Sequence, residues 1–209
     1  AHDVEVPPNR IGPNYTSITP EMLPLVQLTE EEIQCVVDRV PGGAANVQDI
    51  YPLAPLQEGI LFHHLMEGDG DPYVLAFQMS FENRQRLDAY VNAMQRVIER
   101  HDILRTAVMW EGLSEPVQVV WRKTVLPVEE VMLDAAEGDV AQQLYARFNP
   151  RQFRMDVRQA PLVRIYIAHD PAQNRWLTMQ LLHHLAGDRS TYEVIHEDIQ
   201  AYLSGRADR

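Results

Sequence analysis

The sequence of 209 residues has one cysteine, Cys35, which excludes a disulfide framework and a cysteine-ligated zinc site. It is also poor in basic residues: 18 lysines and arginines stand against 30 aspartates and glutamates, giving a formal net charge of −12. Nucleic acids and anionic membranes both attract a basic face, so neither is expected as a partner. No apolar run approaches the roughly 20 residues of a membrane span, and the N-terminus lacks a signal-peptide pattern. These absences favour a globular protein of the cytoplasm.

The rest of the composition is that of an ordinary folded protein, with 45% hydrophobic and 23% charged residues. Hydrophobic periodicity predicts both amphipathic helices and alternating strands. The mixture of hairpins and helices favours an α/β fold, a layered sandwich in which helices pack on a sheet. Helices are expected at about 87–100, 138–148 and 191–203, and strands at about 73–81, 103–110, 116–122, 162–168 and 175–182.

Residues 1–28 contain five prolines and several turn formers. This composition is typical of an extended linker or of an arm laid along a neighbour. A helix is then expected to begin after Thr29, because Glu32 follows three residues later in the spacing of a capping box. Proline and two glycines at 41–43 are expected to end it.

The most informative stretch follows the apolar run 176–182, which leads into His183 and His184, with Asp188 four residues later. Imidazoles titrate near neutral pH and are suited to acid–base chemistry. Successive side chains of a strand point to opposite faces, so one imidazole of the pair is expected to face a substrate. The alternative is two hydrogen-bonded histidines at a strand end, without a chemical role.

A metal site is a further alternative, because histidines also occur in pairs elsewhere in the chain. The available ligands are His63, His64, His183, His184 and Asp188. Neither histidine pair has the i, i+4 spacing of a helical zinc site, so no metal site is predicted.

Four motifs taken together resemble those of the condensation domains of nonribosomal peptide synthetases. Residues 183–188 read His-His-Leu-Ala-Gly-Asp and match the His-His-x-x-x-Asp signature. Residues 100–106 match Arg-His-x-x-Leu-Arg-Thr, and residues 51–62 resemble the opening motif in the form used by epimerising members. Residues 63–71 fit the pattern His-His-Leu-x4-Gly-Asp, which marks the dual epimerisation/condensation type.

The resemblance implies one lobe of a V-shaped fold whose two lobes are each related to chloramphenicol acetyltransferase. Residues 1–48 would be a linker from a preceding module, with one helix, and residues 49–209 the N-terminal lobe. The C-terminal lobe would be absent, with more protein following in nature. An isolated 209-residue chain is therefore expected to show little or no activity.

The implied activity joins two amino acids held on carrier proteins. The domain would invert the α-carbon of an upstream carrier-bound residue and form a peptide bond with a downstream aminoacyl thioester, in the biosynthesis of peptide antibiotics or lipopeptides. It would bind no cofactor directly, because phosphopantetheine arms carry the substrates. Its partners would be the upstream and downstream peptidyl carrier proteins, its own C-terminal lobe and the adjacent modules. The alternative from another class is a non-catalytic docking module for carrier proteins.

The resemblance also implies roles for residues of the signature. His184 would enter the substrate tunnel as the catalytic group, and His183 would be structural. Asp188 would hold the loop through an ion pair with Arg100 or Arg105. The signature's own loop glycine is Gly187, while Arg189 stands where the family usually has a further glycine.

The second motif has two interpretations. It comprises His63, His64, Gly70 and Asp71, together with the intervening residues. These histidines either act directly in epimerisation or shape the channel from a helix end, where positive charge is favourable.

Overall fold

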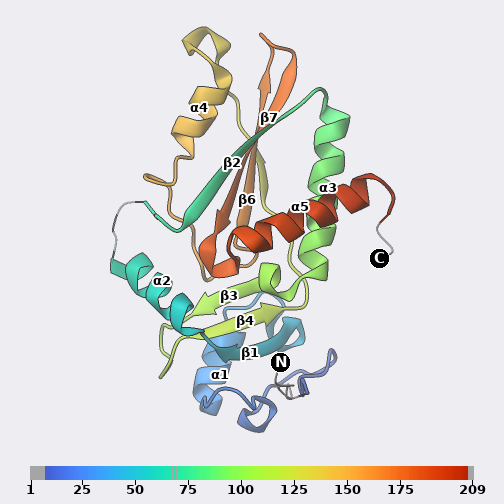
Figure 1. The fold of residues 1–209 in the computed structure, drawn as a ribbon. Coiled ribbons are helices and arrows are strands. Elements are labelled where there is room, and N and C mark those ends of the chain that lie inside the picture. Colours follow the sequence, from blue (N-terminus) through green and yellow to red (C-terminus); the bar gives the residue numbers. More distant parts are fainter. Residues whose placement is uncertain (1–7, 67, 69, 207–209) are drawn as a thin grey trace.

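The computed structural model describes residues 8–66, 68 and 70–206, and it contains two β-sheets (Figure 1). The larger sheet has the strand order β2-β7-β6-β5. Its strands β2, β7 and β6 pair antiparallel, and β5 pairs parallel to β6. The strand bounds are β2 Val74–Phe81, β5 Val128–Glu130, β6 Val163–Asp170 and β7 Arg175–His183.

Helices α3 (Arg84–Arg100) and α5 (Arg189–Leu203) cover one face of the larger sheet. The hydroxyl of Tyr90 on α3 donates to Oε1 of Gln180 on β7, at 2.6 Å. Phe77, which pairs with Gln180 in the strand register, stacks on Tyr192 of α5 with ring centroids 4.1 Å apart. Both helices therefore pack on the face of β7 that carries Gln180.

Helix α4 (Val140–Arg147) lies on the opposite face. The side chain of Gln78 on β2 donates to the carbonyl of Ala141 at 2.8 Å. Because Gln78 directly follows Phe77 in the strand, its side chain points away from α3 and α5. Each face of the sheet is thus covered, which accounts for the almost continuous burial of β6 and β7.

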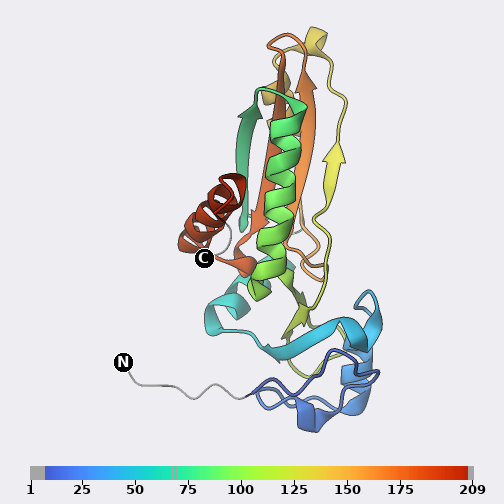
Figure 2. The same cartoon turned by 90° about the vertical axis from the view of Figure 1, so that its right-hand side faces the viewer.

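The smaller sheet has the order β1-β4-β3, with all pairs antiparallel. Its strands are β1 Val47–Pro52, β3 Thr106–Met109 and β4 Val117–Trp121, and α2 (Pro55–Met66) follows β1. In Figures 1 and 2 this sheet lies at one end of the larger sheet, with α1 on its far side.

The N-terminal segment packs onto the smaller sheet and forms a second hydrophobic core with it. Buried side chains of the segment include Ile18, Leu23 and Val26, and each such burial contributes about 1.5–3 kcal/mol. Helix α1 (Glu30–Val37) begins with the predicted capping box, because Thr29 and Glu32 cap each other reciprocally. The described part of the segment therefore packs on the smaller sheet of the same chain. The predicted domain boundary at residue 48 stays a prediction.

The predicted α/β class and the main helices and strands are confirmed. Two strands were not predicted. Strand β1 ends at a proline, a residue that usually opposes strand pairing, and β5 has three residues, all exposed. The predicted hairpin around residues 111–115 forms, but it belongs to the separate smaller sheet. Among the described residues, no helix combines the length and apolarity needed to cross a membrane.

Candidate active site

The two histidines of the signature lie where β7 ends. His183 is the last residue of the strand, and His184 begins a single 3-10 turn, His184–Ala186. The backbone N–H of His184 still donates to the carbonyl of Tyr73, at 2.8 Å, so the turn stays attached to the start of β2. The His183 side chain is fully buried (0% exposed), whereas His184 is partly exposed. The turn thus separates the two imidazoles by environment.

Hydrogen bonds on both ring nitrogens fix the orientation of His183. Its Nδ1 accepts the backbone N–H of Leu185 at 3.1 Å, inside the turn. An accepting Nδ1 carries no proton, so the proton of the neutral ring is on Nε2. Nε2 lies 3.0 Å from Oδ2 of Asp71, to which it donates.

His64 donates to the same carboxylate oxygen from the last turn of α2. Its Nδ1 lies 2.7 Å from Oδ2 of Asp71, and the two imidazole rings are nearly perpendicular, with centroids 5.5 Å apart. Asp71 is 2% exposed and His64 4% exposed. We call these three residues the His64–Asp71–His183 triad.

Strand register brings Asp71 to this point, although 112 residues separate it from His183. Val74, the first residue of β2, pairs with His183, so the residues just before β2 must lie beside the end of β7. The backbone N–H of Tyr73 donates to Oδ1 of Asp71 at 3.0 Å. The carboxylate therefore binds its own loop through one oxygen and both imidazoles through the other.

Gly70 allows the Asp71 loop to take this path. Its φ is +79°, and an added Cβ would lie 2.2 Å from the carbonyl oxygen of Arg151. The next N–H, that of Asp71, donates to the carbonyl of Pro150 at 2.8 Å. Glycine is required here both by the left-handed backbone and by the close approach of another main chain.

In the triad, the environment favours an anionic Asp71 and a neutral His183. Burial alone would raise the pKa of Asp71, but the hydrogen bonds from His183 and His64 outweigh it and hold that pKa well below its usual range. Burial lowers the pKa of His183, against the opposing pull of Asp71. A neutral His183 agrees with the accepting Nδ1 in the turn.

The ligand-type atoms of the triad all lie within 4.8 Å of one another. Two observations favour hydrogen bonds over metal coordination at this point. The 2.7 and 3.0 Å separations are ordinary hydrogen-bond lengths. In addition, the contact from Leu185 leaves Nε2 of His183 protonated, and a metal-binding nitrogen must be free of its proton.

The first histidine pair divides in the same way as the second. His64 is buried in the triad, while His63 is exposed. The ring of His63 lies 6.1 Å from that of Tyr73, the residue whose carbonyl binds the N–H of His184. Each pair therefore contributes one buried histidine to the triad and leaves the other accessible near Tyr73.

Asp188 holds the turn differently from the prediction. It is the N-cap of α5, and its Oδ1 accepts the Thr191 N–H at 3.0 Å and the Ser190 hydroxyl at 2.6 Å. These hydrogen bonds lower its pKa to about 2. Gly187 precedes it with φ +150°, and an added Cβ would lie 2.4 Å from the side chain of Thr191. Arg189 is the first residue of α5, so its backbone there is helical.

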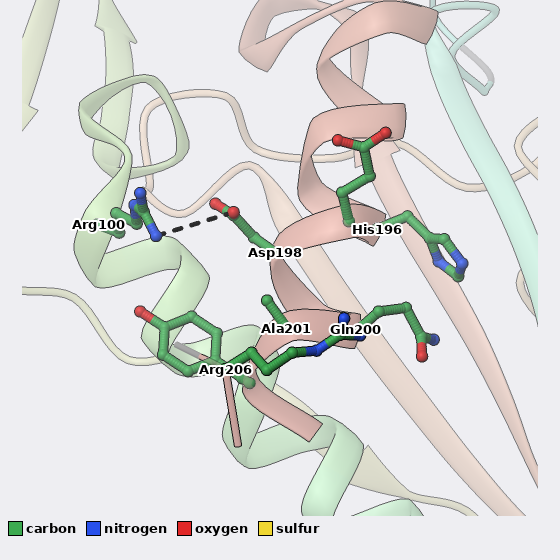
Figure 3. A pocket seen from close by; sticks show the side chains of 8 residues that line it. Arg100, His196, Asp198, Gln200, Ala201 and Arg206 are labelled. Carbon is green, nitrogen blue, oxygen red and sulfur yellow. Dashed lines mark ion pairs between the residues drawn. The ribbon is translucent and has the colours of Figure 1, made fainter. Parts of the chain in front are cut away.

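The predicted ion pair from Asp188 to Arg100 or Arg105 is wrong for the described residues. Arg100 lies opposite Asp198 of α5, with nitrogen and oxygen 3.8 Å apart, in a pocket of about 470 Å³ between α3 and α5 (Figure 3). Arg105 ends the 3-10 turn Asp102–Arg105 and is buried against the smaller sheet, where it binds Asp102 and the carbonyl of Trp121. The physical reason is that a helix N-terminus offers Asp188 unsatisfied N–H groups closer than either guanidinium.

Sequence reasoning placed Asp71 in the second motif but missed its contact with His183. The available signal was the Gly-Asp pair itself, because a glycine before an aspartate suits a sharp turn that ends in a carboxylate. Two further positions of that motif, 67 and 69, lie outside the described residues.

Comparison with known proteins identifies a family for this fold. The chain matches the condensation domain family over residues 47–207. It is 52% identical over 205 residues to malpinin synthetase of Mortierella alpina, in an alignment that covers 98% of this chain and 3% of that protein. It is 50% identical over 203 residues to malpibaldin synthetase of the same organism, covering 97% of this chain and 4% of that protein.

A solved structure supports the fold at lower sequence identity. The starter condensation domain of rhizomide synthetase aligns with a TM-score of 0.60 and 21% identity, over 75% of this chain and 38% of that chain. The α/β architecture is thus that of condensation domains, as predicted. Because the family match extends over more than half of the sequence, the chain belongs to the condensation domain family. It spans 3% and 4% of the length of the two synthetases.

Proposed function

We propose that this chain is the histidine-bearing lobe of a dual epimerisation/condensation domain in a nonribosomal peptide synthetase. The observation that carries the proposal is the division of the turn after β7: a buried His183 fixed on both nitrogens, followed by an accessible His184. This is the arrangement that an acid–base residue on a rigid support requires. Family membership supports the condensation half, and the second motif supports the epimerisation half.

In the condensation step, the amine of the downstream aminoacyl group attacks the thioester carbonyl of the upstream group. A C–N bond forms, the C–S bond breaks, and the phosphopantetheine thiol leaves. His184 accepts a proton from the attacking nitrogen and returns it to the leaving sulfur, so the imidazole ends as it began. An imidazole is suited to both transfers because its pKa lies close to neutral pH.

In the epimerisation step, a base removes the proton from the α-carbon of the upstream residue, and a proton returns to the opposite face. The thioester carbonyl acidifies that C–H bond. His184 is the first candidate for this base, and the exposed His63 near Tyr73 is the second. Both substrates are held as thioesters on the phosphopantetheine arms of carrier proteins, and no cofactor takes part. The proposed setting is the cytoplasm, with adjacent synthetase modules and the second lobe of the domain as partners.

The test for condensation is His184→Ala in the full-length protein that contains this sequence. We expect peptide formation from two loaded carrier proteins to be abolished while the thermal unfolding curve is unchanged. The matched control is His169→Ala, which removes an exposed histidine at the other end of the sheet. If turnover survives in His184→Ala, the catalytic assignment is wrong and the non-catalytic docking module becomes the better account.

The test for epimerisation uses an L-configured upstream residue in deuterated solvent. We expect one deuterium at the α-carbon of the peptide product, together with inversion of its configuration. A product that keeps the L configuration and the α-proton would restrict the function to condensation.

A further inference from the structure

We infer that Asp71 is a positioning residue for His184 and acts through His183, so that the second histidine motif supports the first. This inference rests on the proposed function. It gives the buried residues of the second motif, His64 and Asp71, a role in both reaction steps. The motif alone suggests a role in epimerisation.

The first argument is an unbroken series of contacts from Asp71 to the catalytic turn. Oδ2 of Asp71 accepts from Nε2 of His183 at 3.0 Å, and Nδ1 of the same ring accepts the Leu185 N–H at 3.1 Å. Leu185 follows His184 directly, within the same 3-10 turn. The ring of His183 is thus a rigid spacer between the carboxylate and the backbone that carries His184.

The second argument is that Asp71 selects the tautomer on which this series depends. A carboxylate only accepts hydrogen bonds, so it favours a proton on Nε2 and leaves Nδ1 free to accept. With the opposite tautomer, Nδ1–H would face the N–H of Leu185, and the turn would lose its internal hydrogen bond. The placement of the His184 imidazole thus depends on a group outside the signature.

The third argument concerns His64, which orients the carboxylate from another element. Its Nδ1 donates to Oδ2 of Asp71 at 2.7 Å from the last turn of α2. Together with the N–H of Tyr73 on Oδ1, this fixes both oxygens of Asp71. His64 accordingly supports Asp71, and its loss should have a smaller effect than loss of Asp71.

The main experiment compares Asp71→Asn with wild type in the full-length protein, using carrier-bound donors of L and of D configuration. The asparagine amide has one acceptor oxygen where Asp71 has two, so at least one of the three donors (His64, His183 and the Tyr73 N–H) would face an N–H group. We expect peptide formation to fall about 100-fold with both donors, because a displacement of about 1 Å in a catalytic group costs that much. The D donor bypasses inversion, so it separates the two steps.

The matched control is Asp170→Asn. Asp170 is also buried and hydrogen bonded, with Oδ2 3.0 Å from Nε of Arg175, but it lies at the opposite end of the β6–β7 pair. We expect this variant to lose stability while keeping wild-type turnover per folded molecule. Turnover is therefore expressed per folded molecule for both variants.

A second pair of variants separates a hydrogen-bonding role from simple space filling. His64→Ala removes the donor to Asp71, whereas His64→Asn keeps an N–H close to the position of Nδ1. We expect activity to fall in His64→Ala and to be partly restored in His64→Asn. If Asp71→Asn does not fold, the two His64 variants still test whether the hydrogen bonds of Asp71 are needed for activity.

Three results would overturn the inference. Loss of activity with the L donor alone would make Asp71 specific to epimerisation. Full activity of Asp71→Asn with both donors would exclude a positioning role, and equal activity of the two His64 variants would reduce the contact to packing. The proposed function fails separately, through an active His184→Ala variant.

Discussion

The Gly-Asp dipeptides at 70–71 and 187–188 are used in different ways. Gly70 and Gly187 both have positive φ and no room for a Cβ, and the aspartate that follows each has a lowered pKa. Asp71 is buried and binds two imidazoles, while Asp188 is exposed and caps a helix. The contrast shows that the hydrogen-bond partners of each carboxylate depend more on its environment than on the dipeptide.

The two aspartates also hold the turn that carries His184 from opposite sides. Asp71 fixes the end of β7 through His183, and Asp188 fixes the start of α5. His184 lies between these points, in the 3-10 turn. A turn held at both ends places an imidazole more reproducibly than a turn held at one end. Substitutions at the two aspartates measure how much each one contributes to holding the turn.

The largest effect is expected from Asp71→Ala. Removing one member of a buried, charge-assisted network leaves the partner donors of His64 and His183 unsatisfied, at a cost of about 3–5 kcal/mol. Urea unfolding followed by circular dichroism measures this loss. A change below about 1 kcal/mol would mean that solvent reaches the triad, contrary to the burial of all three side chains.

The next effect is a loss of stability in acid. Asp71 and His183 both have a lower pKa in the folded protein than in the unfolded chain, so the unfolded state binds more protons. Stability from His183 is present above the ordinary histidine pKa of 6.5 and declines as pH falls below it. Stability from Asp71 is present above the ordinary aspartate pKa of 3.8 and declines below that value.

The midpoint of urea unfolding at a series of pH values measures this dependence. We expect the loss below about pH 3.8 to be smaller in Asp71→Asn than in wild type, because the variant lacks the carboxylate whose protonation favours the unfolded state. Asp188→Asn is the matched variant, with an exposed carboxylate whose pKa is about 2. This variant should keep most of the pH dependence of stability that wild type shows. Identical curves for the two variants would mean that the two loops do not differ in this respect.

The smallest effect is expected from Asp188→Ala. It removes an N-cap from a surface helix, where water can replace part of the lost hydrogen bonds. A drop of a few degrees in the melting temperature is the expected result, with Asp188→Ser restoring most of it because serine also caps helices. A loss as large as that of Asp71→Ala would show that Asp188 has a buried partner.

Local sequence signals predicted much of the fold and part of the site. The capping box at Thr29, the hairpin after Met109 and the end of β7 at the histidines all depend on neighbouring residues, and all three form. The burial difference between His183 and His184 arises because β7 ends at His183 and the 3-10 turn begins at His184. The catalytic roles of these residues remain predictions.

The triad could not be predicted from the same signals, because it depends on which strands pair and in what register. Val74 must pair with His183 for Asp71 to reach the imidazole, and a shift of one residue would turn His183 to the other face of the sheet. The Asp188 ion pair was mispredicted for a related reason. The sequence analysis paired the carboxylate of Asp188 with a distant arginine, although the helix that begins at the next residue provides nearer N–H donors.

The most direct test of the account is the protonation state of the His183 ring in the folded protein. Nitrogen-15 NMR of labelled histidine distinguishes the two neutral tautomers from the cation. At neutral pH the account predicts a neutral ring with its proton on Nε2 and an unprotonated, hydrogen-bonded Nδ1, a pattern that Asp71→Asn should disturb. A proton on Nδ1, or a doubly protonated ring, would contradict the link from Asp71 through His183 to the turn that carries His184.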